Sequence, residues 1–375
     1  MLKIAMITTC YQPVINGVVR MIELYREQLT ALGHRVTIFT FGGPSDQDGE
    51  HTVRIPAVPL GKTGYYFRRR FPNHIIELLN QFDMVHCHHL FMGPELLADK
   101  LKPPIVYTNH TRYDLYTEVY LPLPKIIRKP VAKRLIRHLW SRNTAGCAAV
   151  IAPSQHVANV MRSFGVVVPI EVIHNGVQLA NFTAAKPIGS LRPNRSLTGV
   201  YVGRLAAEKN ILPLLDRLVE VCQQNETVRF RLVGHGPLHD ACQRIIAKHQ
   251  LDQQIILEGW VSKESIPSIL ASADFQVTMS VSEVHPLGII EGMAAGLSTV
   301  AQFVYAMSEC VGEAGLLAQN RTDWISGVHK LIDSAELRQT LGAKAKEQAR
   351  KYAIEQTVLE TIELYKKLMA NRTME

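Results

Sequence analysis

The chain has 375 residues, more than one ordinary hydrophobic core accommodates, so its length predicts two domains. Hydrophobic residues make up 47% of it and charged residues 20%, a balance that is typical of globular proteins and excludes an intrinsically disordered chain. The net charge of +8 indicates an anionic partner. No apolar run approaches the roughly 18 residues of a transmembrane helix, and the first residues do not resemble a signal peptide, so we expect a cytoplasmic protein.

Short apolar runs alternate with amphipathic segments, a pattern that predicts βαβ units and parallel sheets. In the first half, Gly33 ends a helix predicted at 21–32. The strands predicted in this half are 3–9, 34–40, 84–89, 104–110 and 148–154. A stretch with Pro187, Gly189 and Pro193 predicts an interdomain linker at about 180–194.

The second half repeats the pattern, with helices predicted at 213–223 and 238–249 and a largely helical end from Ala335 onward. Its predicted strands are 197–203, 228–234, 254–260, 275–280 and 297–302. The six cysteines lack any Cys-x-x-Cys spacing, which indicates free thiols in a reducing compartment rather than disulfides or a zinc site.

A cationic loop follows the strand predicted at 197–203. In GVYVGRLAAEKN the strand ends at Gly203, and Arg204 and Lys209 come after it. Open parallel sheets bind ligands beyond the carboxyl ends of their strands. Arg offers a forked donor and Lys a compact charge, so this loop suits a phosphate.

Two carboxylates flank a short apolar run in SVSEVHPLGIIEGMAAG. We expect Glu291 to open a helix and Glu283 to lie on the loop ahead of it, so that both face a ligand at the helix N-terminus. Carboxylates accept hydrogen bonds from sugar hydroxyls, and the helix end attracts an anion. The pair predicts a sugar–phosphate ligand, although a solvated helix start has a similar pattern.

Together these segments resemble glycosyltransferase family 4, whose members are retaining nucleotide-sugar transferases of the GT-B fold. Gly203, Arg204 and Lys209 match the family's diphosphate-binding motif, and Glu283 and Glu291 match its E-x7-E segment. Similarity extends to YQPVINGVVR near the start, to HNGV at 174–177 and to LVGHGPL at 232–238, which contains Gly234.

The resemblance implies an α/β fold of two Rossmann-like domains with parallel sheets facing an interdomain cleft. We expect an acceptor-side domain at 1–185, a nucleotide-sugar-binding domain at 195–350, and a C-terminal helix at 351–375 that packs back on the first domain. The donor is a UDP-sugar in first place, with GDP- or ADP-sugars as alternatives, and no cofactor is required.

The resemblance also assigns roles to single residues. Gly17 approaches the transferred sugar or a phosphate, and His110 lies beside the donor sugar. Leu287 and Gly288 join Glu283 and Glu291 at the donor. The chain departs from the family where Pro286 stands after His285, because proline lacks the amide that can contact the ligand.

A histidine-rich run, His86, Cys87, His88 and His89, has the residue types of a metal site. Consecutive positions on a strand end point to opposite faces, and no second ligand group with zinc-site spacing follows. We therefore predict no metal.

The acceptor side of the sequence suggests a lipid. HTRYDLYTEVY is similar to a pattern of bacterial transferases that glucosylate diacylglycerol, with Thr111, Tyr113 and Tyr116 matching. Residues 119–170 then hold eight Lys or Arg and no Asp or Glu. If Pro130 starts a helix, its apolar stripe consists of Val131, Leu135 and Leu139, flanked by Ile136 and Trp140, with Lys133, Arg134, Arg137 and Arg142 to the sides.

Such a helix has the composition of an interfacial segment on anionic lipid, and YYFRRRF at 65–71 adds a second patch of aromatics and arginines. The alternative is an ordinary amphipathic helix with basic exposed residues. Nucleic acid is not expected, because no recognition motif accompanies the charge.

The sequence therefore predicts a hexosyltransferase, peripheral at the inner face of the cell membrane, that moves a hexose such as glucose from a nucleoside-diphosphate sugar to a lipid such as diacylglycerol. One alternative is the same chemistry on a soluble sugar, sugar phosphate or polysaccharide. The other is a non-catalytic GT-B protein that only binds a nucleotide.

Overall fold

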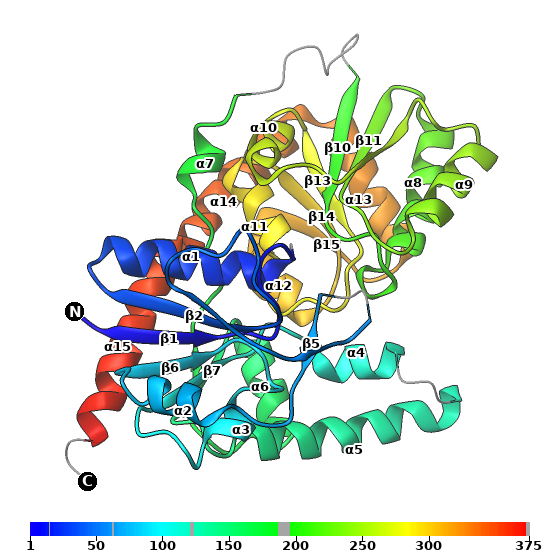
Figure 1. The fold of residues 1–375 in the computed structure, drawn as a ribbon. Coiled ribbons are helices and arrows are strands. Elements are labelled where there is room, and N and C mark those ends of the chain that lie inside the picture. The colour runs from blue at the N-terminus through cyan, green and yellow to red at the C-terminus, as the bar shows by residue number, and fades with distance from the viewer. Residues whose placement is uncertain (15, 62–63, 121–123, 187–195, 373–375) are drawn as a thin grey trace. The chain divides into compact units, whose positions relative to one another are not determined.

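The structure, a computed structural model, describes residues 1–14, 16–61, 64–120, 124–186 and 196–372. The chain divides into two compact units (Figure 1). The first contains Met1–Gly176 together with Ile354–Glu375, and the second contains Val177–Ala353. Each unit is built on one parallel sheet, so the prediction of an α/β protein with two parallel sheets is confirmed.

The sheet of the first unit has seven strands in the order β3-β2-β1-β6-β7-β8-β9. All of its pairings are parallel, and β1 lies at the centre between β2 and β6. The strands are β1 Lys3–Ile7, β2 Arg35–Phe41, β3 Thr52–Ile55, β6 Met84–Cys87, β7 Ile105–Thr108, β8 Ala149–Ala152 and β9 Ile170–Val172, with a separate antiparallel hairpin of β4 Val58–Pro59 and β5 Tyr66–Phe67.

The helices of this unit include the last one of the chain. Helix α15 packs against α1 (Figure 1). Tyr25 Oη of α1 lies 3.2 Å from Thr361 Oγ1 of α15. The helices are α1 Gly17–Ala31, α2 Asn73–Leu79, α3 Pro94–Leu97, α4 Tyr113–Tyr120, α5 Lys125–Thr144, α6 Gln155–Ser163 and α15 Ile354–Arg372.

The second unit has a six-stranded parallel sheet in the order β12-β11-β10-β13-β14-β15. Its strands are β10 Leu197–Val202, β11 Val228–Val233, β12 Ile255–Gly259, β13 Phe275–Thr278, β14 Ser298–Gln302 and β15 Gly315–Ala318. Its helices are α7 Ala180–Thr183, α8 Ile211–Gln224, α9 His239–Lys248, α10 Ile266–Ala271, α11 Leu287–Ala294, α12 Tyr305–Val311, α13 Arg321–Asp333 and α14 Ala335–Ala349, with 3-10 turns η1 Ala207–Lys209, η2 Lys263–Ser265, η3 Gly312–Ala314 and η4 Arg350–Tyr352.

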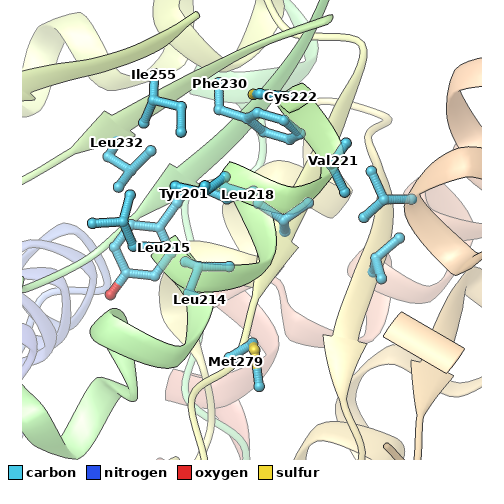
Figure 2. Packing of buried hydrophobic residues seen from close by; sticks show 14 of the residues in the cluster. Tyr201, Leu214, Leu215, Leu218, Val221, Cys222, Phe230, Leu232, Ile255 and Met279 are labelled. Carbon is cyan, nitrogen blue, oxygen red and sulfur yellow. The ribbon is translucent and has the colours of Figure 1, made fainter. Parts of the chain in front are cut away.

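Two hydrophobic cores cover the two faces of this sheet. Successive strand residues point to opposite faces, so Tyr201 belongs to one core and its neighbour Val200 to the other. Figure 2 shows the Tyr201 core, where leucines of α8 pack on Phe230 and Leu232 of β11. The other core gathers α7, α10, α11, α12 and α14. The central strands are therefore buried along most of their length, including polar residues such as Arg231 and Gln276.

The boundary between the units precedes the linker predicted at 180–194. Part of that stretch is helix α7, and its Phe182 is buried in the second core of the second unit. The prediction of a linker is therefore wrong for 180–183. Burial of the Phe182 side chain stabilises this segment against the second unit, although the surrounding composition is that of a linker. The remainder of the predicted linker lies largely outside the described residues.

The central elements match the predictions more closely than the edges do. Each of the ten predicted strands overlaps an observed strand, and the helical C-terminal segment is confirmed as α14 and α15. Five strands were not predicted: β3, β9 and β15, each at the edge of its sheet, and β4 and β5 of the separate hairpin. Helix α1 begins at Gly17 rather than near residue 21, because the Asn16 side chain accepts a hydrogen bond from Val19 N and caps it.

Helix α5 differs from its prediction in two respects. It begins at Lys125, so Pro130 lies inside it and does not start it. Trp140 is fully buried, as is Ile136, so neither belongs to an exposed face. The exposed apolar residues of α5 instead include Ile127, Val131 and Leu135, spaced four apart on one side. Across the described ranges no helix is both long and apolar enough to span a bilayer.

Buried histidines occupy the carboxyl ends of β6 and β7 in the first unit. His86 lies between Tyr365 Oη of α15 and Thr108 Oγ1 of β7, each 2.6 Å from one of its ring nitrogens. Burial lowers the pKa of His86 to about 3 and that of His89 to about 4. These rings are therefore neutral in the folded protein at neutral pH.

We expect this cluster to make the protein less stable in acid. The folded state lowers these pKa values below the ordinary 6.5, so the unfolded chain binds more protons as the pH falls. Stability is fully present above about pH 6.5 and declines below it, by up to about 1.4 kcal/mol per pH unit for each buried histidine. Calorimetry should show the melting temperature falling between pH 7 and pH 5 (about two units).

A pair of variants isolates the contribution of His86 to this pH dependence. His86→Gln should melt lower at pH 7 but lose less on acidification, since one group that resists protonation is gone. His74→Gln changes an exposed residue of α2 and should leave the dependence unchanged. Parallel curves for His86→Gln and the unchanged protein would contradict the assignment.

Candidate functional site

The order of the strands in the second unit creates a topological switch point at the carboxyl ends of β10 and β13. The chain builds outward from β10 to β11 and β12, then returns to the other side of β10 with β13. At such a switch point the loops after the two neighbouring strands diverge and leave room beyond their carboxyl ends. The loop after β10 carries Gly203, Arg204 and Lys209, and the one after β13 carries Glu283.

Glycines bring these loops together. Gly234 has φ of +131°, and a Cβ on it would lie 2.1 Å from the carbonyl oxygen of Gly203. A Cβ on Gly288, in the first turn of α11, would lie 2.9 Å from the carbonyl oxygen of Val202. Only glycine allows such approach, so the loops after β10 and β11 and the start of α11 meet at backbone contact distance.

The structure joins two of the predicted site residues directly. Lys209 Nζ donates to Glu283 Oε1 at 2.7 Å, and both side chains are mostly buried. Ser282 Oγ donates to the carbonyl of Glu208 at 2.6 Å and ties the loop after β13 to the turn that carries Lys209. The sequence analysis missed Ser282, because nothing in its neighbourhood marks that contact.

Opposing effects act on the carboxyl group of Glu283. Burial raises the pKa of Glu283. The charge of Lys209 and the hydrogen bond from it lower this pKa, and together they outweigh the effect of burial, so the net shift is downward. Glu283 is therefore ionised at neutral pH and offers only acceptor oxygens. A charged acceptor held by a cation is suited to binding hydroxyl groups of a ligand.

Arg204 is the exposed cation of the loop. Its side chain is 60% exposed, and its Nη1 lies 3.6 Å from Glu208 Oε1. The carbonyl of Arg204 accepts a hydrogen bond from Tyr201 Oη at 3.1 Å, which fixes the backbone where the strand ends. The guanidinium is thus accessible to an anionic ligand while its backbone is held.

Helix α11 begins at Leu287, so the expectation that Glu291 opens it is wrong. Pro286 is the N-cap residue, and its fixed φ starts the helix directly after it. Glu291 lies in the second turn and is buried. Gln276 of β13 donates to the carbonyl of Ile289 at 3.0 Å and anchors the helix to the sheet. Leu287 and Gly288 form the first turn, whose amides point out of the helix end.

The first unit holds the remaining predicted residues. Gly17 is exposed at the start of α1, directly after the Asn16 cap, which the sequence analysis did not identify. His110 follows β7, and its Nε2 lies 3.0 Å from His88 Nδ1. Burial lowers the pKa of His110 to about 3, so its ring is neutral. Across the part of the chain that the structure describes, no group of three or more histidine, cysteine or acidic side chains is arranged to hold a metal ion.

Helix α5 presents a basic surface. Its sequence contains seven Lys or Arg and no Asp or Glu, and Lys133, Arg134 and Arg137 are exposed. The helix also exposes the apolar side chains of Val131 and Leu135. The hairpin of β4 and β5 adds exposed apolar residues and is followed by arginines 68–70. The sequence analysis found this combination but assigned part of its apolar side to residues that are buried.

Two Rossmann-like units, each built on one parallel sheet, are the architecture of the GT-B fold. The fold matches that of Anabaena HepE, solved in complex with UDP and glucose, with a TM-score of 0.77 and 16% identity over 98% of this chain and 100% of that one. Residues 15–181 match the Glycosyltransferase Family 4 model, and residues 196–334 match the Glycosyl transferases group 1 model. The chain belongs to this family of glycosyltransferases, as its sequence predicted.

Two curated relatives carry the same name. Alpha-monoglucosyldiacylglycerol synthase of Streptococcus pneumoniae is 28% identical over 324 residues, which are 80% of this chain and 71% of the relative. The protein of that name from Acholeplasma laidlawii is 24% identical over 376 residues, which are 94% of each chain. This chain is similar to lipid glucosyltransferases along most of its length.

The glycine contact predicts a large effect of one methyl group. Gly234→Ala should lose about 1–2 kcal/mol of unfolding free energy for the left-handed backbone and a further 1–3 kcal/mol for the clash with the Gly203 carbonyl. Urea unfolding of the purified protein measures the difference.

Gly259→Ala is the matched control. Gly259 also has a positive φ, of +66°, but a Cβ there meets nothing within 4 Å. It should lose only the backbone contribution, about 1–2 kcal/mol. Equal losses in the two variants would show that the contact with Gly203 does not constrain the loop.

Proposed function

We propose that the protein is a retaining glucosyltransferase that moves glucose from UDP-glucose to diacylglycerol at an anionic membrane surface. The Lys209–Glu283 pair, beside the exposed Arg204 at the switch point of the second unit, is the observation that carries the proposal. A sugar diphosphate needs cations to bind its phosphates and, beside them, an ionised carboxylate that accepts hydrogen bonds from the sugar hydroxyls. The names of the relatives supply the identity of sugar and acceptor.

Each part of the UDP-glucose molecule is assigned to residues of matching chemistry. Arg204 and Lys209 hold the diphosphate, and Glu291 binds the ribose. Glu283 binds the hydroxyls of the glucose, since an ionised carboxylate accepts from them. The backbone amides of Leu287 and Gly288, in the first turn of α11, contact the phosphates. Gly203 and Gly234 let the neighbouring loops approach closely, while their own amides donate to the carbonyls of Val233 and Gly259. The UDP-bound neighbour of the same fold supports UDP as the nucleotide.

Departure of the diphosphate is the step that these cations favour. As the bond from the sugar to the phosphate oxygen breaks, negative charge accumulates on that oxygen. Arg204 and Lys209 stabilise this charge without reorganisation, because both are already held by hydrogen bonds or ion pairs. His110 of the first unit orients the sugar, and Gly17 gives the sugar and phosphates close access to the start of α1. Retention agrees with the alpha product in the relatives' name, because UDP-glucose is itself the alpha anomer.

The acceptor proposal is supported by α5. Its exposed apolar stripe, Ile127, Val131 and Leu135, lies among basic side chains, which is the composition of a helix attracted to anionic lipid. A peripheral position at the cytoplasmic face would bring the enzyme to diacylglycerol, which does not leave the bilayer.

The direct test uses purified protein with UDP-glucose and vesicles of phosphatidylglycerol and diacylglycerol. Mass spectrometry should detect glucosyldiacylglycerol. Transfer to glucose or a sugar phosphate, with none to diacylglycerol, would favour a soluble acceptor instead.

The two cations should contribute separately to nucleotide binding. Arg204→Ala and Lys209→Ala should each weaken UDP by about 1.5–3 kcal/mol, roughly 10- to 100-fold, because each removes a charge-assisted contact to phosphate. Isothermal titration calorimetry gives the affinity. Lys248→Ala, an exposed lysine of α9, serves as control and should bind UDP normally. Unchanged affinity in both site variants would remove the diphosphate assignment.

Charge reversal on α5 should release the protein from membranes. Each basic residue near an anionic surface contributes about 1 kcal/mol, so replacing Lys133, Arg134 and Arg137 by Glu should weaken vesicle binding by at least about 3 kcal/mol, on the order of 100-fold. Cosedimentation with phosphatidylglycerol vesicles measures it, and added salt should weaken binding of the unchanged protein.

The control has the same net charge but changes other sites. Lys248, Lys263 and Lys351, exposed residues of the second unit, are replaced by Glu. If both triple variants sediment alike, the membrane contact lies elsewhere on the protein.

A further inference from the structure

A second histidine lies directly behind the one assigned to the donor sugar. His88 follows β6 and is 1% exposed. Its Nδ1 lies 3.0 Å from Nε2 of His110, and the two rings are nearly parallel, with 16° between their planes and 5.3 Å between their centroids. One proton must lie between these nitrogens, so each ring determines the tautomer of the other.

The other nitrogen of His88 indicates which ring supplies that proton. His88 Nε2 is buried and has no hydrogen-bond partner within the described ranges. If His110 were the donor, a neutral His88 would carry its proton on Nε2, as a buried N–H without an acceptor. Native structures rarely contain such groups. His88 therefore carries its proton on Nδ1 and donates it to His110 Nε2.

The position of His88 is fixed by its surroundings. Its backbone N–H donates to the carbonyl of Ile7 in β1, at 2.9 Å. Its ring packs on that of His86, 4.2 Å between centroids, and His86 is held in turn by Tyr365 and Thr108. Burial lowers the pKa of His88 well below its ordinary value and that of His110 to about 3, so both rings stay neutral.

We propose that His88 is a positioning residue, which donates from Nδ1 to Nε2 of His110 and thereby holds the proton of His110 on Nδ1. His110 then faces its ligand as a hydrogen-bond donor in one orientation. The assignment of that ligand as the donor sugar rests on the proposed function. A hydrogen-bond donor held in one orientation accelerates the transfer, because the sugar is already aligned for reaction when it binds.

The tautomer can be measured in the unchanged protein. Nitrogen-15 NMR of the histidine-labelled enzyme distinguishes a protonated from an unprotonated ring nitrogen, and the signals of His110 are assigned by their loss in His110→Gln. The proton of His110 should reside on Nδ1 at pH 7. A proton on Nε2 would overturn the inference without any use of activity.

Two substitutions separate donation from packing. His88→Asn places an amide N–H near the position of Nδ1, whereas His88→Leu fills similar space without a donor. His88→Leu should lower kcat about tenfold with little change in KM for UDP-glucose, and His110 should populate both tautomers. His88→Asn should keep most of kcat and the Nδ1 proton. Equal activity of the two folded variants would contradict the positioning role.

Failure of this inference is distinguishable from failure of the proposed function. An inactive His110→Ala with a fully active His88→Leu would remove only the role of His88. A fully active His110→Ala would remove the role of His110 beside the sugar, and the role of His88 with it. Thermal melting of each variant verifies that the first unit remains folded.

Discussion

The candidate donor site depends on one constraint, the contact of backbone with backbone at the carboxyl ends of β10 and β11. The backbone of Gly234 lies in close contact with the carbonyl of Gly203, and the backbone of Gly288 lies in close contact with the carbonyl of Val202. This proximity brings the turn that carries Lys209 within reach of the loop that carries Glu283. The Lys209–Glu283 ion pair, the guanidinium of Arg204 and the start of α11 therefore lie beyond the carboxyl ends of the same strands. In open parallel sheets, this is where ligands bind.

The two units use the same strand arrangement for different chemistry. In the second unit the loops at the switch point are made of glycine and charge, which suits a phosphate. In the first unit, where β1 and β6 are neighbours, the strand ends carry Thr8, His88 and His89, and Thr8 Oγ1 lies 3.2 Å from His89 Nδ1. Neutral, buried hydrogen-bonding rings suit the orientation of hydroxyl groups rather than the neutralisation of charge.

The sequence predicted the strands at the sheet centres because strands buried on both faces are rich in apolar residues, as in MVHC of β6 and AVIA of β8. It missed β3, β9 and β15, which are three or four residues long and lie at sheet edges, where half-exposed positions dilute that signal. The apolar pattern of α5 contains two stripes, Val131 with Leu135 and Ile136 with Trp140, and spacing alone does not determine which one is buried. The site residues followed from motifs, but the Lys209–Glu283 pair joins groups 74 positions apart, which no local pattern encodes.

Helix α15 completes the first unit with a segment that follows the whole second unit in the sequence. Tyr365 reaches His86, and Thr357 Oγ1 donates to the carbonyl of His174 at 2.9 Å, so residues that precede and follow the second unit in the sequence are joined within the first unit. On the ribosome the second unit is made before that helix emerges, although domains otherwise fold from the N-terminus onward. The first unit is therefore completed only after the second unit has been made, and a chain that stops before Ile354 lacks the helix that packs against α1.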